Sequence, residues 1–399
     1  MTEQEIRNHV STLNLNVTNF SDARFMDQKC IPDVVCAVSE CVMVYLDEDW
    51  DKEFTKNDIW FSPYAHHLIT TSFSKPGLTE DGAKREYDKF FGQPLRLLAY
   101  AGVITLNKRG TTNYYKVARR DLLEYISLRE RNALVFLNAY LEKLMSDNGL
   151  MPYFDNFFNQ QDANSFATLC DKLDHFYWDN TDVQGDYEPS RIYNKIINIF
   201  AHVRRKRGES RGRITENPIT LAEIRYNNVN WRDIKKDKAM TRQEFSQMAS
   251  AMVDDSNSYL NYSIQKAKRF VRQVENDCSE IHRFIPKYTP TQAHHIFMAS
   301  EFPELADCPE NIICLTPNQH LSLAHPNNNT KLVDLDYQIV CLLCKLDSIE
   351  MNNRSGKDDY SLSEFVNVLN TGLNTDVFTP QMDYEEVKYR IIKNAYYQK

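Results

Sequence analysis

Apolar positions along this chain recur mostly with helical spacing. That spacing predicts a buried helix over residues 34–45, helices within residues 127–190 and 246–290, and further helices over residues 335–346 and 384–397. Strand patterns are short: residues 103–107 and 113–117 alternate, and residues 293–297 and 311–315 are brief runs of strand-forming side chains. The pattern therefore predicts an α+β fold that is mostly helical.

Residues 52–126 have the element order of a winged helix-turn-helix. Helical stretches come first, and Gly92 is expected to break one helix before Pro94 begins the next. Two alternating strands follow, joined by a turn at residues 108–110. Such folds place a helix in the major groove and the hairpin on the DNA backbone, although a winged helix can also contact protein. The candidate DNA contacts are basic: Lys84, Arg85, Lys89, Lys108 and Arg109.

The pattern divides the chain into three regions. Residues 1–126 hold the winged helix, residues 127–275 are helical with a basic segment at about 191–245, and residues 276–399 hold the stretch described below and C-terminal helices. Residues 180–189 are polar and predict a linker. In the helical region, a set of phenylalanines predicts a packed core: Phe154, Phe157, Phe158, Phe166 and Phe176.

Composition places the chain among globular proteins. Its 399 residues are 42% hydrophobic and 26% charged, the first ten residues are polar, and no apolar run approaches the length of a membrane span. The nine cysteines are scattered and odd in number, which indicates a reducing environment. We therefore expect a cytoplasmic protein with no membrane partner.

Charge is distributed unevenly along the chain. The net charge of −8 is unfavourable for DNA binding, but residues 195–245 contain thirteen Lys and Arg and six Asp and Glu, a local charge of +7. A local basic surface makes phosphate contacts whatever the total charge, although a solvated charge run is the alternative. Residues 226–232 add asparagines and aromatic rings that can contact bases. The candidate DNA-binding residues are Arg204, Arg205, Lys206, Arg207, Arg211 and Arg213.

Residues 291–330 combine histidines with a strand, loop, strand and helix. The adjacent His294 and His295 lie in the first strand, and the proline-containing residues 298–310 form the loop. The second strand begins at Asn311. Thr316 and Gln319 then predict a capping box at the start of a short helix, which the proline at 326 ends.

Two histidines belong to that helix. His320 lies in its first turn, and His325 follows five residues later. In a regular α-helix that separation is about 500°, so His325 would lie about 140° away from the face that carries His320. We therefore expect His320 to be available for a metal ion and His325 to lie at the helix end or near DNA, with His325 kept as a rival ligand.

This order of residues resembles the ββα-metal module of the HNH nucleases. The resemblance implies that His294 and His320 bind the metal ion, that His295 is the general base and that Asn311 braces the loop. Other stretches are similar to HNH-type Type II restriction endonucleases of bacteria, namely RFMDQKCIPDVVC, FTKNDIW, QPLRLLAYAGV, YNNVNWRD and ENIICLTPNQHLSLAHPNNNT. A second pair, His66 and His67, lacks such companions and is expected to be a surface or packing pair.

The resemblance implies a sequence-specific endonuclease for double-stranded DNA. Hydrolysis of a phosphodiester needs an activated water and a cation, expected here to be Mg²⁺ or else Mn²⁺ or another divalent ion. Cutting both strands needs two sites, which implies a homodimer on a two-fold symmetric target. The alternatives are a nonspecific or RNA-guided defence nuclease and a DNA-binding protein with an inactive module. A nuclease built on carboxylates and a lysine would start at Asp33, but its motif does not continue.

Cysteine spacing leaves a zinc site as a minor alternative. Cys341 and Cys344 form a C-x-x-C pair that Cys278 and Cys308 could complete. A pair one helical turn apart on an apolar helix is more typical of packing. We therefore expect the cysteines to lie in the core.

Overall fold

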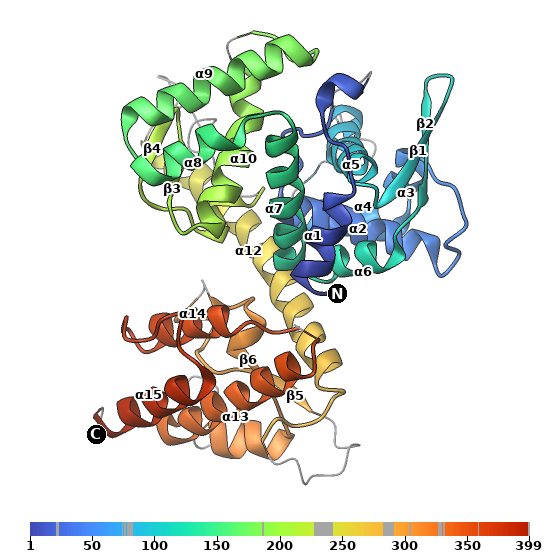
Figure 1. Ribbon diagram of the computed structural model, residues 1–399. Helices are drawn as coiled ribbons and strands as arrows, with labels where there is room; N and C mark the ends of the chain where they lie inside the picture. Colours follow the sequence, from blue (N-terminus) through green and yellow to red (C-terminus); the bar gives the residue numbers. More distant parts are fainter. Residues whose placement is uncertain are drawn as a thin grey trace. The chain divides into compact units, whose positions relative to one another are not determined.

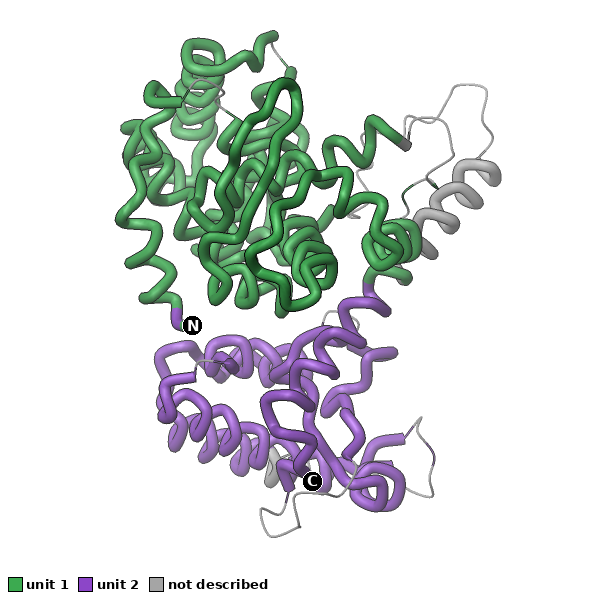
Figure 2. The backbone as a smooth tube through the Cα atoms, turned by 90° about the vertical axis from the view of Figure 1, so that its right-hand side faces the viewer, with its two compact units in different colours: residues 1, 3–259 green, residues 2, 260–399 purple. Residues whose placement is uncertain are grey.

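Helices and three short antiparallel strand pairs make up the computed structural model of this chain (Figure 1). The structure describes residues 1–20, 24–73, 75, 77, 83–185, 187–226, 242–281, 291–302, 305–325, 329, 332–357 and 359–397. These residues form two compact units, 3–259 and 260–399 (Figure 2). The expected α+β, mostly helical class is confirmed.

The first unit contains sixteen described elements before the long helix α12 (Arg242–Val274), which contributes residues to both units. They are α1 (Glu3–Ser11), η1 (Val17–Asn19), α2 (Pro32–Leu46), α3 (Lys56–Trp60), α4 (Pro63–Ser72), α5 (Ala83–Tyr100), β1 (Ile104–Arg109), β2 (Thr112–Val117), α6 (Arg120–Leu128), α7 (Glu130–Asp147), α8 (Met151–Gln160), α9 (Ala163–Asn180), α10 (Glu188–Val203), β3 (Arg207–Ser210), β4 (Arg213–Pro218) and α11 (Leu221–Ile224).

Helices α2 and α7 form the centre of the first unit. Most residues of both helices are buried, as the apolar pattern of residues 34–45 predicts for α2. Helix α7 packs against α1, α2 and α6, so the expected regions on either side of residue 126 belong to one compact unit. Cys36 and Cys41 are buried in α2 as expected, and neither forms a disulfide.

Helices α3 to α5 and the β1–β2 hairpin follow the order expected of a winged helix. Phe54 adds an isolated antiparallel bridge to Tyr115 on β2, with backbone hydrogen bonds of 2.9 and 2.7 Å. The expected break at Gly92 is wrong, because α5 runs unbroken through Gly92 and Pro94. A proline removes a single backbone hydrogen bond, and burial of apolar side chains on both sides of it outweighs that cost. Those side chains are Tyr87, Phe90, Phe91, Leu95, Leu97 and Leu98, all fully buried.

Helices α8, α9 and α10 carry the aromatic core that the phenylalanine pattern predicts. Phe154, Phe157 and Phe158 on α8 are buried, as are Phe166 and Phe176 on α9. The ring of Phe154 meets Phe200 of α10 edge to face, with 5.0 Å between centroids. The β3–β4 hairpin packs against α10.

The second unit holds the histidine-rich stretch. Its described elements after α12 are β5 (Gln292–His295), η3 (Pro309–Asn311), β6 (Ile312–Leu315), η4 (Gln319–Ala324), α13 (Leu335–Arg354), α14 (Leu362–Gly372) and α15 (Tyr384–Tyr397). All four residues of β6 are buried, and they lie in one apolar cluster with side chains of α12, α13, α14 and α15. Helix α13 packs against both α14 and α15. The expected C-terminal helix is confirmed over residues 384–397.

A buried ion pair between Glu280 and Lys345 contacts β6. The Glu280 carboxylate accepts a hydrogen bond of 2.8 Å from the backbone N–H of Cys314, and the Lys345 ammonium lies 3.3 Å from its other oxygen. Burial raises the pKa of Glu280 to about 7, whereas the charge of Lys345 opposes that rise. Neither side chain is exposed, so the pair fixes β6 between residue 280 and α13.

Candidate metal and hydrolytic centre

Strands β5 and β6 fix the positions of the two adjacent histidines. They pair antiparallel, with His294 opposite Ile313 and His295 opposite Ile312. Because side chains alternate along a strand, the two imidazoles leave β5 on opposite faces. His294 is 4% exposed, and His295, the last residue of the strand, is half-buried. The imidazoles of His294 and His295 therefore cannot both bind one metal ion while β5 is a regular strand. Each ring has different neighbours.

Asn311 joins the two strands to the loop between them. Its side-chain oxygen accepts a hydrogen bond of 2.9 Å from Phe297 N–H, and its amide donates to the carbonyls of Phe297 and Leu305 at 3.0 and 3.1 Å. The side chain is completely buried. These are the contacts expected of a brace, so Asn311 positions the site and does not face a reacting atom.

The helix after β6 begins as the sequence predicts and then departs from it. The backbone N–H of Thr316 donates to the Gln319 side chain at 2.8 Å, and Gln319 N–H donates back to the Thr316 hydroxyl at 3.3 Å, as in a capping box. From Gln319 to Ala324 the helix is a π-helix, so the expectation of a regular α-helix is wrong. The i→i+5 hydrogen bonds of a π-helix add about one residue to each turn. His325 is thereby brought round to the face that carries His320.

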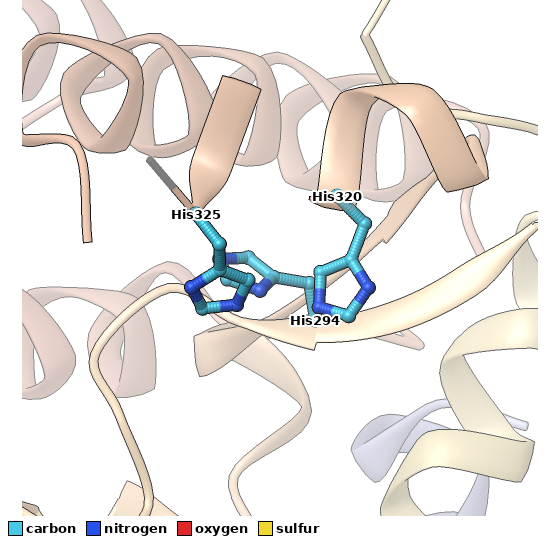
Figure 3. Close-up of side chains that lie close together, drawn as sticks. All are labelled: His294, His320 and His325. Atoms are coloured by element: carbon cyan, nitrogen blue, oxygen red, sulfur yellow. The ribbon is translucent and has the colours of Figure 1, made fainter. Parts of the chain in front are cut away.

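Three imidazoles meet as a result (Figure 3). The rings of His294, His320 and His325 point toward one another, and each pair of ring centroids is 5.0 Å apart. One nitrogen from each ring lies within 4.8 Å of the others. These three side chains are the one group within the described part of the chain that offers three or more metal ligands. The cysteine alternative, with all four cysteines described, is therefore not supported.

Hydrogen bonds fix which nitrogen is free on two of these rings. His320 Nδ1 lies 2.5 Å from the side-chain oxygen of Gln292, and His325 Nδ1 lies 2.7 Å from the carbonyl oxygen of Leu332. Both partners are acceptors, so Nδ1 carries the proton and Nε2 keeps its lone pair for a metal ion. Sequence reasoning missed Gln292, although its position two residues before His294 places it on the same face of β5.

Burial and neighbouring charges lower the pKa of two of the three rings, His294 and His320. Burial, followed by repulsion from His320 and His325, lowers the pKa of His294 to about 3. Burial and then His325 also lower the pKa of His320. A neutral imidazole is the form that binds a metal ion, so these lowered pKa values favour the ligand form of His294 and His320.

The donor set of the cluster favours some metal ions over others. Three neutral imidazole nitrogens suit Zn²⁺, Co²⁺, Ni²⁺ and similar ions, whereas Mg²⁺ prefers oxygen ligands. Three protein ligands also leave coordination positions for water and substrate. The residues present fit a transition-metal ion better than the Mg²⁺ expected from the sequence.

His295 has a different environment from the three clustered rings. Its Nε2 lies 2.8 Å from the carbonyl oxygen of Ala306 in the loop, so Nε2 carries the proton and Nδ1 keeps the lone pair. Burial lowers the pKa of His295, and the Ala306 carbonyl opposes that change. An imidazole held in one tautomer with a free nitrogen is suited to accept a proton from water.

The basic segment divides into structural and exposed residues. Arg204 is half-buried, pairs with Glu142 at 3.2 Å and lies 4.8 Å from the ring centroid of Phe200. The guanidinium of Arg207 donates to the carbonyl of Gln161 at 2.5 Å. These two candidates make contacts within the unit, whereas the exposed candidates are Arg205, Lys206, Arg211 and Arg213. Residues 227–232, which carry most of the predicted base contacts, lie outside the described residues.

The β1–β2 hairpin presents the other basic candidates. Lys108 and Arg109 are exposed near its turn, and Arg109 pairs with Glu53 at 2.7 Å. Lys84, Arg85 and Lys89 are exposed on α5. The arrangement keeps these residues accessible on the first unit.

Comparison with protein families, curated proteins and solved structures finds no match for this chain. Among the described residues, every helix is too short or too polar to cross a membrane.

Proposed function

We propose that this chain is a metal-dependent DNA endonuclease of the HNH type that cuts double-stranded DNA at a specific sequence. The observation that carries the proposal is the convergence of His294, His320 and His325 beside a strand end that holds His295 in a single tautomer. The strand–loop–strand–helix order and the brace by Asn311 support the same interpretation.

The residues of the centre have distinct roles in this proposal. His294, His320 and His325 would hold the metal ion, which would neutralise charge that builds up on the phosphate. His295 Nδ1 takes a proton from a water molecule, and the water oxygen forms a bond to phosphorus. The phosphorus–oxygen bond opposite to that attack then breaks, the leaving oxygen takes a proton from solvent, and His295 returns its proton to solvent. One water is consumed, and the products are a phosphate monoester and a hydroxyl.

DNA binding is assigned to the first unit. Its exposed basic residues on the β1–β2 hairpin, α5 and the β3–β4 hairpin would contact the backbone, and the winged-helix order of residues 52–126 supports recognition of duplex DNA. Because one centre cuts one strand, we propose that two copies of the chain act together on a two-fold symmetric target.

The first experiment measures metal binding and cutting separately. Co²⁺ is titrated into the protein and its visible absorbance is followed, because tetrahedral and octahedral Co²⁺ absorb differently. A DNA of known sequence is then incubated with the protein and Co²⁺, Mn²⁺, Ni²⁺, Zn²⁺ or Mg²⁺, with EDTA as the control. We expect Co²⁺ to bind and discrete fragments to form with at least one transition metal.

The other outcomes distinguish the rival functions. A smear of fragments indicates a nonspecific nuclease. DNA binding without cutting under every metal indicates a binding protein with an inactive module. If His294→Ala leaves both Co²⁺ binding and cutting intact, the centre is not where the proposal places it.

A further inference from the structure

Strands β3 and β4 form a hairpin that is fixed to α10 (Figure 1). The Asn198 side chain on α10 donates a hydrogen bond of 2.9 Å to the carbonyl of Glu209 and accepts one of 2.7 Å from its N–H. Gly208 lies so close to α10 that a Cβ there would come within 2.4 Å of the Asn198 side-chain oxygen. The backbone N–H of Arg207 also donates to the Gln161 side chain at 2.9 Å. The hairpin is therefore a preformed element of the first unit.

The turn of this hairpin has an arginine in the left-handed conformation. Ser210 pairs with Arg213, so the turn consists of Arg211 and Gly212, whose φ angles are 58° and 72°. These angles are typical of a type I′ turn, in which asparagine, aspartate or glycine is the usual first residue. The Glu209 carboxylate accepts a hydrogen bond of 2.5 Å from Gly212 N–H, which fixes the turn. Backbone preference therefore does not explain the arginine at position 211.

A cleft of about 630 Å³ opens beside the hairpin. The Thr215 hydroxyl shapes its wall, because it accepts a hydrogen bond of 3.0 Å from Gly208 N–H and donates one of 2.7 Å to the Asn217 carbonyl. Four exposed polar side chains line the cleft, namely Arg211, Arg213, Glu216 and Asn217. Within the described part of the chain, none of these four side chains forms a hydrogen bond or an ion pair. They are therefore available to a ligand.

The β1–β2 hairpin differs from this one in how its charges are used. Arg109 pairs with Glu53 at 2.7 Å and lies 4.6 Å from the ring centroid of Tyr114. Lys116 pairs with Asp51 at 2.8 Å. These two cations are compensated within the first unit, whereas the charged groups of the cleft are not.

The chemistry of the cleft indicates a nucleotide ligand. Arginine forms strong, paired hydrogen bonds with phosphate. A carboxylate repels phosphate but accepts a hydrogen bond from the amino group of cytosine, and asparagine can pair with the edge of adenine. A surface that bound phosphates alone would gain nothing from Glu216. The two arginines with Glu216 and Asn217 therefore fit the backbone and the base edges of one DNA segment.

We propose that the β3–β4 hairpin and its cleft read the base sequence of the target duplex. A two-stranded ribbon fits the major groove, which is about 12 Å wide. Arg211 and Arg213 bind backbone phosphates and set the register, and Glu216 and Asn217 accept hydrogen bonds from amino groups of cytosine or adenine. This inference rests on the proposed function and deepens it, because it names the side chains that select the target.

The test measures sequence preference without cutting. Duplexes with a randomised central region are selected for binding to the protein in EDTA, which removes divalent metal ions, and the bound duplexes are sequenced. We expect the wild type to enrich a defined motif. Asn217→Ala and Glu216→Gln should each lose the preference for an adenine or a cytosine at one place in that motif and keep the rest.

Dissociation constants for two duplexes that differ at that place give the size of the effect. The wild type should prefer the motif duplex by about tenfold or more, and Asn217→Ala should reduce this ratio to about twofold or less. Arg213→Ala should weaken binding to both duplexes equally. The matched controls are Asn156→Ala and Asp155→Asn, which change an exposed amide and an exposed carboxylate of α8 outside the cleft lining and should keep the wild-type ratio.

The remaining outcomes separate this inference from the proposed function. If the wild type cuts at one sequence while Asn217→Ala and Glu216→Gln keep the whole motif, the inference fails and the nuclease stands. If both variants lose their place in the motif but no metal ion supports cutting, the hairpin reads DNA and the proposed nuclease fails.

Two further results overturn the inference itself. The wild type enriches no motif, or Arg213→Ala relaxes a base preference that Asn217→Ala and Glu216→Gln retain. Should Asn217→Ala unfold, as measured by circular dichroism, Asn217→Ser decides by the same ratio of dissociation constants.

Discussion

His66-His67 and His294-His295 are the same dipeptide in two different backbones. The first pair lies in α4, where His67 is exposed and the backbone carbonyls of both residues accept hydrogen bonds from the hydroxyls of Thr70 and Thr71. The second pair lies at the end of β5, where each ring enters a different environment. Only the second pair gains companions, because a strand partner and a π-helix bring His320 and His325 to it. The dipeptide alone does not make a site; the elements that follow it do.

The strongest test of this comparison removes the proposed base. His295→Ala should lower the single-turnover rate of DNA cleavage by about 10²- to 10⁴-fold, because it removes the imidazole that the proposal assigns to accept a proton from water. Co²⁺ affinity and DNA affinity should be unchanged, since His295 lies on the other face of β5 from the three clustered rings. His67→Ala is the control and should cut normally. A His295→Ala protein that cuts within tenfold of the wild-type rate would remove the base assignment.

The next test concerns the third ring of the cluster. His325→Ala should weaken Co²⁺ binding by about 100-fold, since even a residue that only orients a metal ligand contributes 10- to 100-fold. The measurement is the Co²⁺ absorbance titration, with His66→Ala as the control. If affinity does not change, the metal site has only the two ligands inferred from the sequence, His294 and His320.

A smaller effect on Co²⁺ binding is expected when Gln292, the side chain that orients His320, is replaced. Gln292→Leu removes the acceptor of the 2.5 Å hydrogen bond to His320 Nδ1 and should weaken Co²⁺ binding by about tenfold. Gln292→Glu keeps an acceptor and should bind Co²⁺ at least as tightly as the wild type. Equal affinity for all three proteins would mean that the ring is positioned by packing alone.

The smallest expected effect concerns the arginines of the basic segment. As with the two histidine pairs, the same residue type lies in two environments, exposed or paired within the unit. Arg211→Ala and Arg213→Ala remove exposed side chains, so each should reduce the salt dependence of DNA binding by about one phosphate contact and leave the thermal midpoint unchanged. Arg204→Ala removes a side chain paired with Glu142, so it should lower the thermal midpoint with little change in the salt dependence. The opposite pattern would mean that exposure does not separate binding from structural arginines.

Sequence alone predicts the parts of this site that depend on local rules. The capping box of Thr316 and Gln319 and the two strands follow from residue types at fixed spacing, whereas the role of Asn311 as a brace comes from the resemblance. Cores are predicted similarly well, as the phenylalanines of α8 and α9 show. In each of these cases a local pattern of residue types indicates the element or the burial, even where the contact itself joins distant residues.

The features that sequence does not predict depend on distant contacts. Tertiary burial carries α5 through Gly92 and Pro94 against local preference. Partners far along the chain, Glu142 and Gln161, occupy Arg204 and Arg207, so counting charges overestimates the basic surface. The π-helix places His325 with His320, and no propensity rule marks where a helix widens.

That widened turn has a consequence for chain length. In an α-helix, ligands four residues apart lie about 400° around the axis and so nearly on one face. The π-helix reaches a similar alignment with five, so it absorbs one additional amino acid without moving the second imidazole. Deleting one residue of this turn, for example Ser322, would let the π-helix become an α-helix while the imidazoles of His320 and His325 still converge. The centre is thus expected to keep its convergence after a one-residue deletion at the place where its ligand spacing looks least regular.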